Sequence, residues 1–87
     1  MTRERSNEFM LDLLKKVQPL QIEVLKRGYS AHIDAGISDW DDVDRSYFDC
    51  TIFEGTDIRE RYEFHYTDTE EQMEATLAKL RADINAL

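Results

Sequence analysis

The chain has 87 residues, of which 41% are hydrophobic, and a formal net charge of −8 at pH 7. This length is typical of one domain, so we expect a single small domain over residues 1–87, with enough apolar residues for a core but a thin stability margin as a monomer. The negative charge disfavours direct binding to nucleic acid or to an anionic membrane surface, because both are themselves negative.

The cysteine content and the chain start predict a cytoplasmic protein. Cys50 is the one cysteine, so no intramolecular disulfide can form, as is usual in reducing compartments. The amino terminus leads into a polar amphipathic segment and lacks the apolar core of a signal peptide. No apolar stretch approaches the roughly 20 residues that span a bilayer, so we expect no membrane association.

The first expected element is a helix over residues 6–27. Ser6 is a candidate N-cap, and Gly28 is a candidate left-handed residue just after the helix end. Hydrophobic residues recur at helical spacing at Phe9, Leu13, Val17, Leu20 and Val24. Pro19 favours either one kinked helix or two shorter ones, and we prefer one because the apolar phase continues across it.

Three strands are expected after this helix. Alternating residues predict a strand over 29–35, and stronger patterns predict strands over 47–54 and 59–66, joined as a β-hairpin by residues 55–57. Residues 36–46 are interpreted as a long acidic loop. Long ordered loops are often functional, so this one is a candidate site.

The register of the predicted hairpin follows from parity and charge. The hydrophobic faces of the two strands coincide only where the numbers of paired residues sum to an even value. A sum of 112 opposes Asp49 to Glu63, two like charges, whereas a sum of 114 opposes Asp49 to His65 and Thr51 to Glu63. We therefore favour the sum of 114.

A second helix completes the predicted fold. It can begin at either of two overlapping capping boxes, Thr67 with Glu70 or Thr69 with Gln72, and runs to about residue 86. Its apolar seam is formed by Met73, Leu77, Leu80, Ile84 and Leu87. The predicted class is α+β with the order α-β-β-β-α, in which both helices pack on one face of a three-stranded antiparallel sheet.

No residue pattern predicts catalysis, and we expect neither catalytic residues nor a cofactor. Cys50 shares strand parity with Phe48 and Ile52 on the core face, whereas His65 belongs to the opposite face, so the two cannot form a dyad if the strands are correct. Glycine-rich phosphate loops and common hydrolase and metalloprotease motifs do not occur. The sequence therefore predicts a protein that is not an enzyme.

The acidic segment 39–44 raises the question of a divalent-cation site. It fails the EF-hand pattern, because the sixth position counted from Asp39 is Asp44 and the twelfth is Cys50, where glycine and glutamate are needed. A second set with suitable ligand types lacks a close-spaced pair: His32, Asp34, Asp49 and His65. We expect no metal site and keep a cation-responsive loop as an alternative.

The negative charge is concentrated in the middle of the chain. Residues 34–74 carry −11, whereas residues 1–27 carry +2 and residues 75–87 carry +1. Such a surface attracts a basic partner, although it can also serve solubility alone. The candidate partner-binding residues are Trp40, Asp41, Asp42, Asp44, Tyr47 and Phe53. Tryptophan and tyrosine are enriched at binding hot spots, but Trp40 could instead fold back onto an edge of the core.

The leading functional hypothesis is an acidic cytoplasmic protein–protein interaction module. Leu11 and Ile22 widen the apolar arc of the first helix beyond what one sheet needs, so they are candidate dimer-interface residues and we expect a homodimer. One alternative is an acidic inhibitor or immunity-type protein that blocks a basic, nucleic-acid-binding site on another protein. Another is a divalent-cation-responsive protein that uses the Asp-rich loop 39–44.

Overall fold

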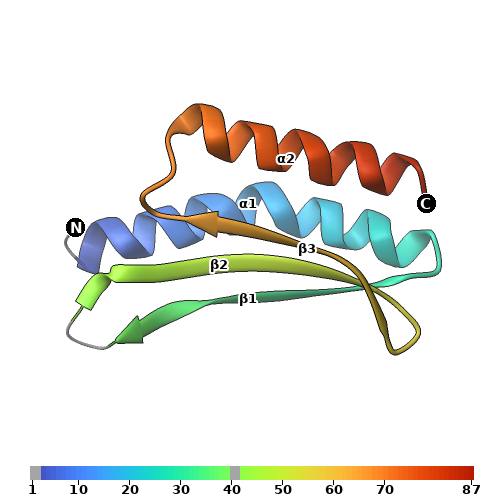
Figure 1. The fold of residues 1–87 in the computed structure, drawn as a ribbon, viewed down its shortest axis with the longest axis horizontal. Coiled ribbons are helices and arrows are strands. Elements are labelled where there is room, and N and C mark those ends of the chain that lie inside the picture. The colour runs from blue at the N-terminus through green and yellow to red at the C-terminus, as the bar shows by residue number, and fades with distance from the viewer. Residues whose placement is uncertain (1–2, 40–41) are drawn as a thin grey trace.

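The fold is a three-stranded antiparallel sheet with two helices (Figure 1). The structure is a computed structural model that describes residues 3–39 and 42–87, with the side chains of residues 4–36 and 46–87. The elements are α1 (Arg3–Lys26), β1 (Ser30–Asp39), β2 (Asp42–Glu54), β3 (Asp57–His65) and α2 (Glu70–Asn85). In the sheet the strand order is β1-β2-β3. The predicted α+β class and the order α-β-β-β-α are confirmed.

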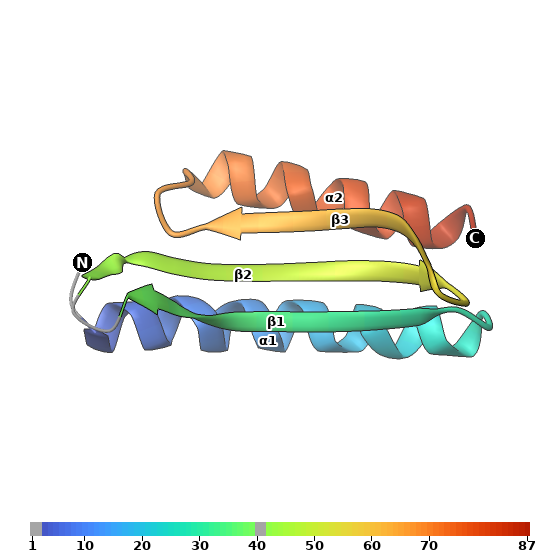
Figure 2. The same cartoon turned by 60° about the horizontal axis from the view of Figure 1, so that its bottom comes forward.

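Both helices cover the same face of the sheet. In Figure 2 the sheet lies in front, with α1 behind β1 and α2 behind β3. Helix α1 packs on β1 and β2, whereas α2 packs on β3 and on α1. The central strand β2 is therefore covered by helix on one side only.

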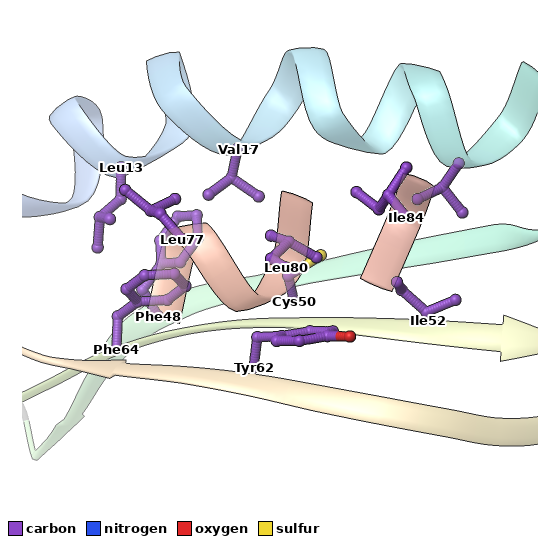
Figure 3. Close-up of a cluster of buried hydrophobic side chains, with 11 residues drawn as sticks. Leu13, Val17, Phe48, Cys50, Ile52, Tyr62, Phe64, Leu77, Leu80 and Ile84 are labelled. Atoms are coloured by element: carbon purple, nitrogen blue, oxygen red, sulfur yellow. The ribbon is translucent and has the colours of Figure 1, made fainter. Parts of the chain in front are cut away.

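The core fills the space between the helices and the sheet (Figure 3). Its buried members are Phe48, Cys50, Ile52, Tyr62 and Phe64 from the sheet, and Leu13, Val17, Val24, Leu77, Leu80 and Ile84 from the helices. The rings of Phe48 and Phe64 pack edge to face with centroids 5.9 Å apart, a favourable aromatic arrangement. The predicted core face of β2, with Phe48, Cys50 and Ile52, is confirmed.

Helix α1 is a single helix that continues across Pro19, as preferred from its apolar phase. Its start was predicted wrongly, because Arg3 is already helical and Ser6 is therefore not the N-cap. Ser6 is fully buried, and its hydroxyl hydrogen-bonds that of Ser46 on β2. A serine suits either role, so sequence could not separate a cap from a buried hydrogen bond. Gly28 follows the helix end with φ of +85°, as expected.

The segment 36–46 is not the long loop that was predicted. Strand β1 continues to Asp39 and β2 begins at Asp42, so the segment belongs to a long hairpin except for residues 40–41, which lie outside the described residues. Acidic residues are poor strand formers by themselves. Here the ladder between β1 and β2 continues through them in step as far as Ile37, so pairing overrides local propensity.

The pairs of the β2–β3 hairpin from Tyr47–His65 to Ile52–Glu60 sum to 112, so the preference for 114 was wrong. Beyond a register shift after Ile52, the pairs next to the turn sum to 111. Asp49 lies opposite Glu63, and on the other side of the sheet Phe48 lies opposite Phe64. A like-charge pair costs roughly 0.2–1 kcal/mol, whereas a good aromatic pair contributes about 0.5–1.5 kcal/mol beyond its buried area. In the observed register, core packing therefore offsets the repulsion between the two acids.

The predicted turn and cap between the later elements are confirmed. Gly55 has φ of +62° in the turn between β2 and β3, a conformation that favours glycine. Helix α2 begins at the second of the two predicted capping boxes. Thr69 Oγ1 accepts from the backbone N–H of Gln72 at 3.1 Å, and Gln72 Oε1 accepts from the N–H of Thr69 at 2.8 Å.

Candidate partner-binding surface

The sheet face opposite the helices is here called the open face, and it faces the viewer in Figure 2. Successive side chains of a strand alternate between faces, and pairing aligns them in rows across the sheet. Taken from β1 to β3, its rows are Gly36–Tyr47–His65, Asp34–Asp49–Glu63, His32–Thr51–Arg61 and Ser30–Phe53–Ile58. The first three rows carry six charged or titratable side chains, His32, Asp34, Asp49, Arg61, Glu63 and His65, together with Tyr47.

Two aromatic side chains stand near the two ends of the open face. Tyr47 and Phe53 are half-buried and lie on β2, about 20 Å apart along the strand. The Tyr47 ring lies across Gly36 of β1, since a Cβ atom on Gly36 would come within 3.0 Å of Tyr47 Oη. The absent side chain at Gly36 therefore gives the tyrosine ring its place on the sheet. Both aromatics were predicted as partner-binding residues.

A row of three carboxylates crosses the sheet between these aromatics. Asp34, Asp49 and Glu63 come from three different strands and are paired in register. The pKa of Asp49 is raised, first because burial disfavours its charge and next because of Asp34; Glu63 adds to this, whereas Arg61 and His32 act against it. The row therefore concentrates negative potential at the centre of the open face.

The sequence contained this carboxylate row, but the interpretation missed it. Opposing Asp49 to Glu63 was considered and set aside because like charges repel. The usable signal was the aromatic pair Phe48 and Phe64, which the same register places together in the core. Asp34 was seen only as one member of a weak metal-ligand set.

The other predicted partner-binding residues lie beyond what the structure describes. Trp40 and Asp41 are outside the described residues, and Asp42 and Asp44 belong to β2 with side chains outside the described set. The Asp-rich loop 39–44 proposed for a divalent cation is affected in the same way. The candidate surface is therefore built on Tyr47, Phe53 and the carboxylate row.

The predicted dimer-interface residues lie on the exposed surface of α1. Leu11 is 57% exposed and Ile22 is 53% exposed. Leu25, which the sequence analysis did not single out, is also 57% exposed. The surplus of apolar residues on this helix is therefore larger than predicted.

The one thiol lies in the core rather than on a reactive surface. Cys50 is 1% exposed, and burial, with a smaller effect of Asp49, raises its pKa to about 11. His65 is exposed on the open face, so the predicted separation of these residues by the sheet is confirmed. Among residues 4–36 and 46–87, no group of three or more His, Cys, Asp or Glu side chains is placed to hold a metal ion.

A hollow of about 240 Å³ lies beside the end of α2. Its polar side chains have partners: Tyr62 Oη donates to Asp83 Oδ2 at 2.6 Å, Glu60 Oε2 lies 3.2 Å from Lys79 Nζ, and Arg59 Nη1 lies 3.0 Å from Glu54 Oε2. Lys79 also stacks over the Tyr62 ring at 5.1 Å. These contacts join α2 to β3, so this group of polar side chains has a structural role.

Comparison of the chain with family models, with curated proteins and with solved structures finds no match. Within residues 3–39 and 42–87, no helix has the length and apolar character needed to cross a membrane. Function is therefore inferred from the surfaces described above.

Proposed function

We propose that this chain is an acidic protein–protein interaction module without catalytic activity, that it acts in the cytoplasm as a homodimer, and that its open face binds a basic segment of a partner protein. The observation that carries the proposal is the carboxylate row of Asp34, Asp49 and Glu63 between Tyr47 and Phe53. A cationic side chain over the row would relieve its repulsion, and the two aromatic rings would supply apolar contacts at either end.

The position of the row favours a specific contact over a diffuse one. Asp49 is half-buried on the central strand, and partly buried charges are screened less by salt than fully exposed ones. A lysine or arginine placed there interacts with three carboxylates together, whereas most exposed ion pairs contribute little. Binding should still weaken with salt, since the attraction is electrostatic.

A second candidate function has the same surface. The charge of −11 over residues 34–74 would also suit an inhibitor or immunity-type protein that occupies a basic, nucleic-acid-binding site of another protein. The two functions predict different effects of this chain on nucleic-acid binding by the partner. Saturating the isolated partner with this chain would abolish its nucleic-acid binding only in the second case.

The test compares two variants with the same change in net charge. One replaces the row, Asp34→Asn with Asp49→Asn and Glu63→Gln; the control replaces three exposed acids of α2, Glu70→Gln with Glu71→Gln and Glu74→Gln. Wild type and both variants are used as bait in the host cytoplasmic extract. The affinity of each of these three chains for the protein that wild type captures is then measured. We expect the row variant to bind about tenfold or more weakly, and the α2 variant to bind nearly as wild type.

Two outcomes would contradict a binding site on the open face. Equal weakening by both variants would show that only net charge matters and would contradict a site on the open face. Unchanged binding by the row variant would remove the row from recognition. Replacing Tyr47 and Phe53 by alanine tests the apolar part in the same assay.

A further inference from the structure

Three exposed aliphatic side chains of α1 lie in one line. Leu11, Ile22 and Leu25 are 57%, 53% and 57% exposed. With 3.6 residues per turn, Ile22 lies three turns after Leu11 on the same side of the helix, and Leu25 follows in the next turn. Leu14, partly buried, flanks the line. We call Leu11, Leu14, Ile22 and Leu25 the α1 stripe.

Three members of the α1 stripe, Leu11, Ile22 and Leu25, are more than half exposed, whereas Leu14 packs partly against the core. Helix α2 lies on another side of α1, where Lys16 Nζ is 3.9 Å from Glu74 Oε1 and Arg27 Nη1 donates to Asn85 O at 3.4 Å. Single exposed apolar residues are ordinary, but several on one side of a helix indicate an interaction surface.

We propose that a second copy of this chain covers the α1 stripe, with the two α1 helices packed antiparallel about a twofold axis at Gln18. This inference rests on the proposed homodimer and specifies its interface. Residues whose numbers sum to 36 are then level with each other: Leu11 with the partner's Leu25, and Leu14 with the partner's Ile22. All four members of the stripe are paired at once, as an isologous interface requires.

Gln18 is the exposed polar residue at the centre of this arrangement. It lies level with its own copy on the twofold axis. A polar residue within an otherwise apolar helix seam fixes the register, because shifting the helices would place its amide against aliphatic side chains. The pairing sum of 36 is therefore favoured over neighbouring sums.

The charges beside the stripe complement a second copy in this orientation. Glu8 and Lys26 are both exposed and project to the same side of Leu11, one near each end of the helix. In the antiparallel pair Glu8 lies near the partner's Lys26, and the twofold axis creates this contact twice. In a parallel pair both Glu8 side chains would lie at one end and both Lys26 side chains at the other, so the pairing would be lost.

The size of the interface sets the expected affinity. The stripe spans about 21 Å between Leu11 and Leu25, at 1.5 Å per residue. One helix from each copy makes a small interface, so we expect reversible association with a dissociation constant on the order of micromolar. The oligomeric state must therefore be measured over a range of concentrations.

Sedimentation equilibrium tests the interface with a matched pair of variants. Leu25→Glu places a charge in the stripe, and Ile58→Glu makes the same change at a residue of β3 that is also 57% exposed. We expect Leu25→Glu to be monomeric up to on the order of a hundred micromolar, and Ile58→Glu to dimerise as wild type. Both sites are exposed, and circular dichroism with urea denaturation checks that each variant folds. Equal dimerisation by the two variants would overturn the α1 interface.

Charge reversal tests the orientation. Glu8→Lys and Lys26→Glu should each weaken dimerisation by roughly three- to tenfold, and the double variant should recover most of the loss. Gln18→Cys should form a disulfide-linked dimer on mild oxidation, whereas Arg81→Cys on the exposed side of α2 should not; the native Cys50 is buried in both. Additive losses in the double variant, or equal crosslinking at both cysteines, would overturn the antiparallel arrangement.

The outcomes separate this inference from the proposed function. A wild-type chain that stays monomeric at these concentrations would overturn both the homodimer and its interface, while binding of a basic partner to the open face would still be measurable. A wild-type dimer that is unaffected by Leu25→Glu would overturn the α1 interface alone.

Discussion

Asp49 of β2 and Glu63 of β3 lie directly opposite each other on the open face, although both are acidic. Asp34 of β1 extends the same row on the other side of Asp49. The repulsion is tolerated because the same strands place Phe48 against Phe64 on the core face. One face of the sheet thus stabilises a register that the other face opposes, and such local conflicts are expected at functional sites.

Neutralising the centre of the row should stabilise the protein. We expect Asp49→Asn to raise the free energy of unfolding by about 0.5–1 kcal/mol at pH 7, because it removes repulsion from both neighbours while keeping the side-chain shape. Urea denaturation measures the change. In a Glu63→Gln background the gain should shrink, since part of the repulsion is already gone; an equal gain in both backgrounds would show that the two carboxylates do not interact.

The stability gain of Asp49→Asn should depend on pH. The pKa of Asp49 is raised above its ordinary value of 3.8 in the folded protein, so folding favours its protonated form. The destabilising charge is fully present above the raised pKa and disappears as the pH falls through that pKa towards 3.8. The difference between wild type and Asp49→Asn should therefore be largest at neutral pH and narrow in acid. A difference that widens in acid would contradict the direction of this shift.

The fold followed from the sequence wherever side-chain periodicity was strong. Helix α2 has a regular apolar seam and a capping box. Hydrophobic and polar residues alternate clearly in the central parts of β2 and β3, so these three elements were predicted. Ser6 and the segment 36–46 were misassigned because their structure depends on partners distant along the chain. Ser6 reaches Ser46 across 40 positions, and the acidic strands are held by each other.

The candidate site was predictable only in part for a related reason. Tyr47 and Phe53 stood out as aromatics on a strand face that would otherwise be solvated, which needs only parity. The carboxylate row required the register of three strands. That register is fixed by core packing, which a comparison of charges on the exposed face does not reveal.

The hydrogen bond between Ser6 and Ser46 should contribute to stability cooperatively. Both serines are buried, at 0% and 4% exposure, and their hydroxyl groups join the start of α1 to β2. We expect Ser6→Ala and Ser46→Ala each to cost about 1 kcal/mol, because each removes one partner of a buried hydrogen bond. The double variant should cost clearly less than the two single variants together. Strictly additive costs in urea denaturation would show that the two hydroxyl groups are not coupled.

The thiol of Cys50 should be protected until the protein unfolds. Its pKa is raised to about 11, so at pH 8 only about one molecule in a thousand carries the reactive thiolate, and the side chain is also 1% exposed. We expect the native protein to react very slowly with a thiol-specific reagent, and labelling in urea to follow the loss of circular dichroism. An Arg81→Cys variant, with its added cysteine on the exposed side of α2, should show one fast and one slow thiol in the same reaction. Fast labelling of wild type under native conditions would contradict this protection, because Cys50 lies within the core cluster between the sheet and the helices.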